Sequence, residues 1–213
     1  FLGSIGSLGC ISFHETKIIH SGLGGALFVN DESLIDRVEE IWERGTNRTK
    51  MFKGLVDKYS WVQPGSSFYP SELQAAFLLA QLESIDDNLK FRERLTGHYF
   101  EELRALENNG FLRMQSRGET EKWNHHAVVI ILNSTKDCDG LRKYLKEQGI
   151  IAYIGYVPLH SSKMGKSMGW EEDDLPITEE YSQRVLRLPL HHEMSEQDVS
   201  RVCSEIEKYL SKN

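Results

Sequence analysis

Short apolar runs separated by glycine-rich turns mark the first part of the chain. The runs at residues 10–13 and 26–29 predict two short strands, and we expect the first of them to be buried. Apolar side chains then recur at helical spacing over residues 32–44, and Gly45 is a typical helix stop. The segment 46–69 has no clean periodicity, and a loop of this length is usually functional or disordered.

Helical periodicity takes over at Pro70, a residue type that often begins helices. Apolar positions at helical spacing continue to Leu106, which makes this the longest helical stretch of the chain. We expect it to break or bend between Ser84 and Arg92.

The second half alternates strand and helix patterns after a polar stretch at residues 108–124. In order, the patterns predict a strand at 126–132, a helix at 135–148, a strand at 150–157, a loop at 161–177, a short helix at 179–185, a strand at 186–190 and a final helix. Ser195 and Asp198 form a capping-box-like start for that last helix. The alternation predicts a small α/β or α+β domain.

Composition narrows the class of protein. The 213 residues are 39% hydrophobic and 27% charged, with a net charge of -7, so the chain is a poor candidate for non-specific nucleic-acid binding. No apolar run approaches the roughly 18 residues of a membrane helix. The three widely spaced cysteines fit neither a disulfide framework nor a CxxC metal site, and they favour a reducing cytoplasmic setting. Because the chain does not begin with Met, we expect an N-terminal part to be missing.

One short segment carries a candidate nucleophile. Ser12-Phe13-His14-Glu15-Thr16-Lys17 is followed by Gly22-Leu23-Gly24-Gly25. A lysine placed after a strand and beside glycines can form a Schiff base, while Ser12 offers a hydroxyl to a phosphate. The alternative is a solvated lysine before a turn, which is the more common case for a short motif.

Further segments show a resemblance that covers essentially the whole chain in order. They are Gly45-Thr46-Asn47-Arg48, Val56-Asp57-Lys58-Tyr59, Gly65-Ser66-Ser67-Phe68, Glu72-Leu73-Gln74-Ala75-Ala76, Pro158-Leu159-His160 and Leu186-Arg187-Leu188-Pro189-Leu190. Together with the lysine motif, they resemble the DegT/DnrJ/EryC1/StrS sugar aminotransferases. These are pyridoxal-phosphate (PLP) enzymes of the α/β fold type I, like aspartate aminotransferase. The first two segments resemble the branch that makes dTDP-4-amino-4,6-dideoxygalactose.

The resemblance implies a role for each matching residue. Lys17 would be the catalytic residue that carries the cofactor, and Ser12 would bind the cofactor phosphate. Ser67, where many relatives have Asn, would reach the phosphate of the neighbouring subunit's cofactor. Asn47 and Arg48 would contact the nucleotide sugar. His160 would be a further, weaker substrate contact.

Two positions depart from the family pattern. Leu23 stands where Glu is common, which would remove a polar contact near the cofactor, and Gly155 stands where His is frequent. The acid that pairs with the pyridine nitrogen and the ring-stacking residue lie upstream of residue 1 in the family pattern. The chain would therefore be the end of the large domain with its connecting helix, residues 1–107, and the small C-terminal domain, residues 108–213.

The implied activity is transfer of an amino group from glutamate to the C4 keto group of a dTDP-4-keto-6-deoxyhexose, by a cytoplasmic homodimer with a shared active site. The pathway that the family implies is cell-surface polysaccharide synthesis. Three alternatives stay open: a sister enzyme acting at C3 or on another nucleotide, a non-catalytic partner module of the same fold, and an unrelated α/β scaffold.

Two other groups of residues have chemical potential. The adjacent histidines at 125–126 and 191–192 lack the spacing of a helical metal site, and we expect no metal. The basic cluster of Arg48, Lys50, Lys53 and Lys58 is either a solvated loop or a surface that faces a diphosphate. The sequence does not decide between these two interpretations.

Overall fold

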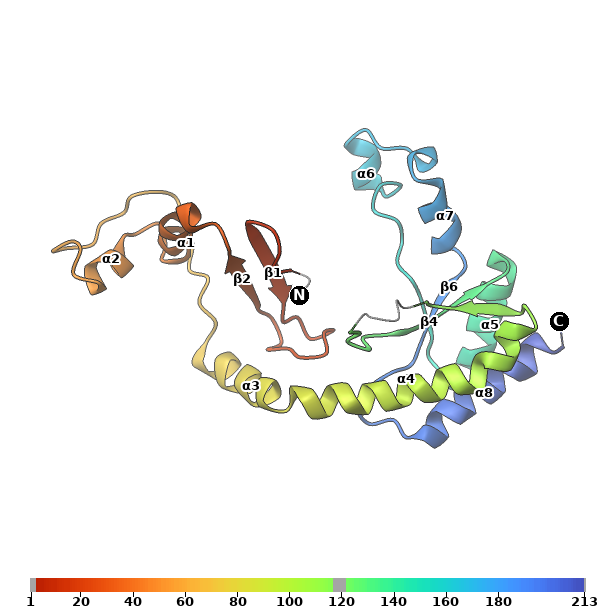
Figure 1. Cartoon of the computed structure of the whole chain (residues 1–213). Helices are drawn as coiled ribbons and strands as arrows, with labels where there is room; N and C mark the ends of the chain where they lie inside the picture. The colour runs from red at the N-terminus through yellow and green to blue at the C-terminus, as the bar shows by residue number, and fades with distance from the viewer. Residues whose placement is uncertain (1–2, 117–121, 213) are drawn as a thin grey trace. The chain divides into compact units, whose positions relative to one another are not determined.

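Two units make up the chain in the computed structural model, which describes residues 3–116 and 122–212. They are Phe1–Ile85 and Asp86–Asn213 (Figure 1). The predicted division after residue 107 follows the long helix, whereas the contacts group most of that helix with the second unit. None of the described helices is both long and apolar enough to cross a membrane.

The first unit begins with an antiparallel hairpin of β1 (Leu8–Ser12) and β2 (Gly25–Val29). Leu8 lies opposite Val29 and Ser12 opposite Gly25. Both predicted strands are confirmed, but the expectation that the first is buried is wrong. Only Gly9 is buried in β1, because a two-stranded sheet needs a covering layer to hide its faces.

Helices and a long loop at residues 53–71 form the rest of the first unit. The 3-10 turn Glu32–Leu34 leads into α1 (Ile35–Trp42), and Gly45 follows with a φ of 77°, as its predicted role as a stop requires. The segment predicted as a loop contains a short helix, α2 (Arg48–Phe52). After Ser71, which caps α3 (Glu72–Glu83), the chain breaks at Ser84 as predicted and continues as α4 (Ile85–Asn108).

The second unit is built on a four-stranded antiparallel sheet in the order β3-β4-β6-β5. Its strands are β3 (Leu112–Met114), β4 (Val128–Leu132), β5 (Tyr153–Ile154) and β6 (Val185–Leu188). The sequence patterns missed β3 and overestimated β5. Both errors concern edge strands, where few residues pair and the periodic signal is weak.

Between and after these strands lie α5 (Thr135–Glu147), α6 (Lys163–Ser167), the 3-10 turn Glu172–Asp174, α7 (Pro176–Ser182) and α8 (Glu196–Leu210). The prediction of a loop at residues 161–177 is wrong, because α6 and the 3-10 turn lie within this segment. The predicted capping of α8 is confirmed, since Ser195 and the Asp198 side chain cap each other's backbone N–H groups.

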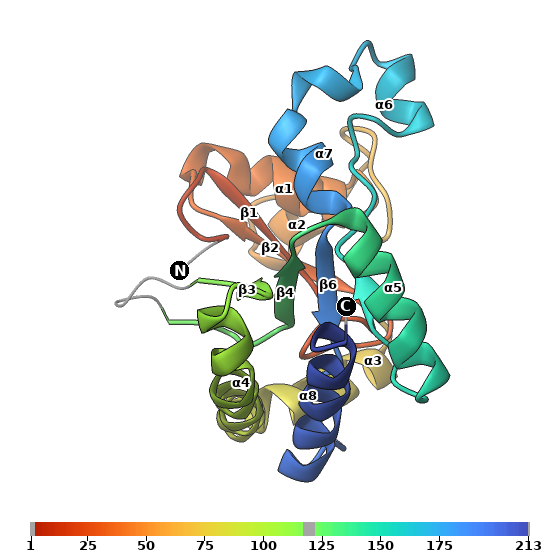
Figure 2. The same ribbon diagram turned by 90° about the vertical axis from the view of Figure 1, so that its right-hand side faces the viewer.

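A single apolar core joins the sheet of the second unit to α4, α5 and α8 (Figure 2). Burial alternates along β4 and β6, so one face of the sheet contacts these helices. Tyr99 of α4 is fully buried and its hydroxyl donates to the Pro189 carbonyl oxygen at 2.8 Å. Arg92 of the same helix is also buried, and its guanidinium donates to the carbonyl oxygens of His125 and His126, each at 2.9 Å.

Candidate active site

Lys17 lies in the connection between β1 and β2. Backbone hydrogen bonds continue past the strand ends, with Phe13 N donating to Gly24 O and Glu15 N to Gly22 O, each at 2.8 Å. The connection is therefore an ordered extension of the hairpin.

A tight local turn fixes the backbone at the lysine. Lys17 N donates to His14 O at 2.9 Å, and the His14 ring accepts at Nδ1 from Thr16 N at 3.2 Å. The Lys17 side chain is exposed, and within the described residues its ammonium has no ion pair with a carboxylate. The structure thus presents a primary amine on a locally ordered backbone.

Ser12 lies at the base of the same connection, as the last residue of β1. Its Oγ accepts from His14 N at 3.3 Å, which leaves the hydroxyl proton available to a ligand oxygen. The strand and the turn therefore bring Ser12 and Lys17 into one ordered segment, and His14 contacts both.

The glycines of the motif divide into two kinds. A Cβ on Gly25 would lie 2.8 Å from the Ile11 carbonyl oxygen, so the hairpin itself needs this glycine, whereas a Cβ on Gly24 would lie 2.4 Å from a side-chain atom, Ser21 Oγ. Gly22 has a φ of 78° and open space where its Cβ would be. Of the three, Gly22 is the one that leaves room for a ligand to approach the backbone closely.

Two glutamines of α3 hold the connection in place, and sequence reasoning missed both. Gln81 makes a paired contact with the His20 backbone, accepting from its N–H at 3.1 Å and donating to its carbonyl oxygen at 2.8 Å. Gln74 donates to Leu23 O at 3.0 Å. Their spacing of seven residues on one helix face was the available signal, because a primary amide can pair with a peptide group.

The predicted nucleotide-sugar contacts, Asn47 and Arg48, lie where the chain enters α2. Asn47 Oδ1 accepts from Ser60 N at 2.7 Å, so this oxygen is used to hold the returning loop. The Arg48 guanidinium carbon lies 5.0 Å from the centre of the Phe52 ring. Arg48 has no ion pair with a carboxylate among the described residues.

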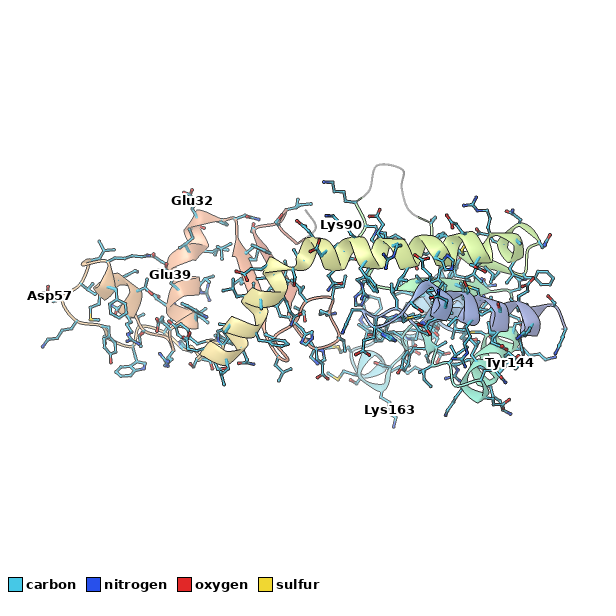
Figure 3. All side chains as sticks on the ribbon, turned by 90° about the horizontal axis from the view of Figure 1, so that it is seen from below. Glu32, Glu39, Asp57, Lys90, Tyr144 and Lys163 are labelled. Atoms are coloured by element: carbon cyan, nitrogen blue, oxygen red, sulfur yellow. The ribbon has the colours of Figure 1, made fainter. Side chains whose placement is uncertain are left out.

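The basic cluster separates into paired and unpaired members. Lys50 Nζ lies 2.9 Å from Asp36 and 3.0 Å from Glu40, and these contacts raise the pKa of Lys50. Lys53 Nζ lies 2.9 Å from Glu39 of α1, which is labelled in Figure 3. These two lysines fasten α2 and the residue after it to α1. Of the four cations of this cluster, Arg48 and Lys58 are the two without a carboxylate partner among the described residues.

Ser67 lies beside the loop that contains Asn47, although twenty residues separate them in sequence. Its backbone pairs with Glu43 in an isolated antiparallel bridge, and Arg44 N donates to Ser66 O at 3.2 Å. The Ser67 side chain is exposed. The structure therefore brings Ser67 to the Gly45–Arg48 loop.

His160 belongs to the second unit, apart from the other five predicted residues. It is buried, and its Nε2 lies 3.2 Å from Glu179 Oε1. Gly165 packs closely against it, since a Cβ there would lie 2.0 Å from His160 O. The His160 ring therefore contacts Glu179 within its own unit. No group of three metal-ligating side chains is found among the described residues.

Comparison with known proteins places these residues in context. The chain is 30% identical over 221 aligned residues to the spore coat polysaccharide biosynthesis protein SpsC of Bacillus subtilis, covering 96% of the chain and 54% of SpsC. It is 28% identical to dTDP-3-amino-3,6-dideoxy-α-D-galactopyranose transaminase of Aneurinibacillus thermoaerophilus, covering 98% and 53%. It is 27% identical to dTDP-4-amino-4,6-dideoxy-D-glucose transaminase of Shigella dysenteriae, covering 94% and 52%. The chain thus spans about half the length of these relatives.

Solved structures show the same fold. An aminotransferase from Psychrobacter cryohalolentis matches with a TM-score of 0.87 and 20% identity, covering 99% of this chain and 57% of that one. A DegT DnrJ EryC1 StrS aminotransferase from Brucella abortus matches with a TM-score of 0.80 and 28% identity, covering 97% and 52%. The α/β fold is that of the fold type I transferases, as predicted. The family model for the DegT/DnrJ/EryC1/StrS aminotransferases matches residues 1–207, and the chain belongs to that family.

Proposed function

We propose that this chain supplies the cofactor-carrying lysine of a PLP-dependent sugar-nucleotide aminotransferase. The first unit would be the end of the large domain and the second unit the small domain. The observation that carries the proposal is the exposed, unpaired Lys17 amine on an ordered turn, with the Ser12 hydroxyl at the base of that turn. An amine, a hydroxyl donor and the open backbone at Gly22 fit an aldehyde with a phosphate group.

Lys17 Nζ would hold the cofactor covalently, and Ser12 would donate to its phosphate. When bound, PLP supplies an electron-withdrawing ring that makes the α-carbon proton of an amino acid removable. As a neutral amine, Lys17 Nζ would accept that proton and donate it again. Thr16 and His14 keep the turn in place, so the amine moves only through its own flexible side chain.

We further propose that glutamate is the amino donor and that the acceptor is the C4 keto group of a dTDP-4-keto-6-deoxyhexose. Arg48 and Lys58, the two members of the basic cluster without a carboxylate partner among the described residues, would face its diphosphate. The similar transaminases named above include one for a 3-amino and one for a 4-amino sugar, which makes a C3 enzyme the main alternative. NMR of the product formed from the keto-sugar nucleotide and glutamate would distinguish the two positions.

Peptide mapping after reaction with PLP and borohydride tests the lysine assignment. We expect one reduced adduct, on Lys17, and none in Lys17→Ala. Lys163→Ala is the matched control, because Lys163 is also exposed but lies in the second unit. Adducts spread over surface lysines, or an unchanged adduct yield in Lys17→Ala, would contradict the proposal.

The shared active site is a separate proposal, in which Ser67 serves the cofactor of a neighbouring subunit in a homodimer. Its support is the exposed Ser67 side chain, which leaves the hydroxyl available to a second copy. Mixing Lys17→Ala and Ser67→Ala chains should then restore one intact site in each mixed dimer. A mixture that binds PLP no better than the average of its parts would exclude the shared arrangement.

A further inference from the structure

A buried carboxylate, Glu43, lies between the Gly45–Arg48 loop and the segment of Ser67, which carry three of the five predicted ligand contacts of the first unit. Its side chain is 7% exposed. The Tyr69 hydroxyl donates to Glu43 Oε1, and Arg44 Nη1 lies 3.4 Å from Glu43 Oε2. Burial and this hydrogen bond raise the pKa of Tyr69, which keeps the phenol protonated as the donor. Both carboxylate oxygens therefore have partners, as a buried charge requires.

The backbone of Glu43 makes contacts in the same two directions. Toward the Gly45–Arg48 loop, the Glu43 carbonyl oxygen accepts from Thr46 Oγ1 at 2.8 Å. Toward the other segment, Glu43 pairs with Ser67 in the isolated bridge. One residue thus contacts both neighbouring segments through its main chain, and through its side chain it reaches Tyr69, two residues beyond Ser67.

The backbone around this cluster is unusual, which indicates that its geometry is imposed by the surrounding contacts. Arg44 has a φ of 63°, uncommon for a residue other than glycine, and Gly45 follows at 77°. Gly65 approaches so closely that a Cβ on it would lie 2.1 Å from Gly45 N. Tyr69 packs against Trp42, with ring centres 4.0 Å apart.

We propose that Glu43 is a positioning residue, which holds the Ser67 hydroxyl and the Asn47–Arg48 pair in a fixed relation for phosphate-bearing ligands. The inference rests on the proposed function, because it takes Ser67 as a phosphate contact. The Glu43–Tyr69 hydrogen bond joins the segments on either side of Ser67 and Gly45. Without it, each hydroxyl or guanidinium would have to be ordered when the ligand binds, which lowers affinity.

The test compares two probes that differ only in the phosphate, PLP and pyridoxal. In Glu43→Gln and Tyr69→Phe, we expect the dissociation constant of PLP to rise roughly tenfold, the factor expected from losing one hydrogen bond to a charged group. The dissociation constant of pyridoxal should stay the same. If Glu43 had only a structural role, its loss would weaken the binding of PLP and of pyridoxal equally. That result would overturn the inference.

Two further variants separate the positioning role from other effects. Ser67→Ala should weaken PLP binding by itself. In the Ser67→Ala background, adding Glu43→Gln should change the dissociation constant of PLP very little. Glu39→Gln is the matched control, because it removes a carboxylate of α1 that pairs with Lys53 and not with the Ser67 segment. A Glu43→Gln effect that persists in full in the Ser67→Ala background would contradict the proposal.

Hydrogen exchange supplies a readout that does not depend on cofactor binding. In Glu43→Gln and Tyr69→Phe, amides of residues 44–48 and 60–69 should exchange faster together, whereas Glu39→Gln should affect only residues around Lys53. Unchanged exchange in either segment would overturn the inference. If the variants show this exchange result but the wild-type chain forms no Lys17 adduct, the outcome would instead count against the proposed function.

Discussion

Each of the two units is stabilised by a different kind of internal contact. In the second unit, α4, α5 and α8 bury a continuous apolar core against one face of the sheet. In the first unit, no large apolar side chain of the described residues is buried, and its buried side chains are polar ones such as Glu43 and Thr46. Five of the six predicted site residues lie in this first unit. Regions that bind ligands are often drawn from the less stable part of a fold, and the contrast follows that pattern.

The first unit also exposes much apolar surface. Leu73 is 84% exposed, Trp61 72% and Leu23 69%. Exposed apolar groups of this size typically mark contact surfaces. We therefore expect its geometry to depend on contacts in the assembled protein, while the second unit carries its own stability.

The largest difference should appear when matched leucine-sized side chains are truncated in the two units. Ile206 is fully buried in α8, so Ile206→Ala should lower the free energy of unfolding by about 2–5 kcal/mol. Leu73→Ala, at an exposed helix position, should change it by less than about 0.5 kcal/mol. Urea denaturation followed by circular dichroism measures both. Equal losses would mean that the first unit has a core of its own.

A smaller effect is expected at the buried guanidinium of Arg92. Arg92→Met would remove the Arg92 hydrogen bonds to the His125 and His126 carbonyl oxygens, at a cost of about 1–3 kcal/mol in the free energy of unfolding. Arg94→Met is the control, because Arg94 lies two residues further on with a 62% exposed side chain. In thermal unfolding, the melting temperature of Arg92→Met should lie well below that of Arg94→Met. The opposite order would show that the carbonyl contacts contribute little.

The smallest effect is a pH dependence confined to the second unit. Burial raises the pKa of the Cys138 thiol to about 11 and that of Cys203 to about 12, from a usual value of 9.0. Because the unfolded thiols lose their protons first, stability is complete below about pH 9 and falls above it, by about 1 kcal/mol for each thiol at pH 10.

Unfolding from pH 8 to pH 10 tests that dependence. Cys203→Ala should flatten the decline even though it lowers stability at pH 8. Cys10→Ala, which removes the exposed thiol of the first unit, should change neither. A decline that is just as steep without Cys203 would assign it to other groups.

Local features of the chain were determined by the sequence. Helical spacing, the Ser195 cap, Gly45 and the break at Ser84 were all predictable, because each depends on residues within a few positions of one another. The motif that pairs Ser12 with Lys17 was also readable, since one hairpin carries both. The loop prediction for residues 161–177 was wrong because the short helices there lack a periodic apolar face that the sequence could show.

Only the tertiary structure decided which polar groups are already used. Lys50 and Lys53 looked equivalent to Arg48 and Lys58, yet carboxylates of α1 pair with the first two. Likewise, no sequence pattern near Glu43 predicts its hydrogen bond with Tyr69, which is 26 residues away. Pairings of this kind depend on how loops return to a helix, and long side chains can reach many partners. The pattern of apolar and polar residues therefore determined most helices and strands, whereas the tertiary structure determined which polar side chains pair.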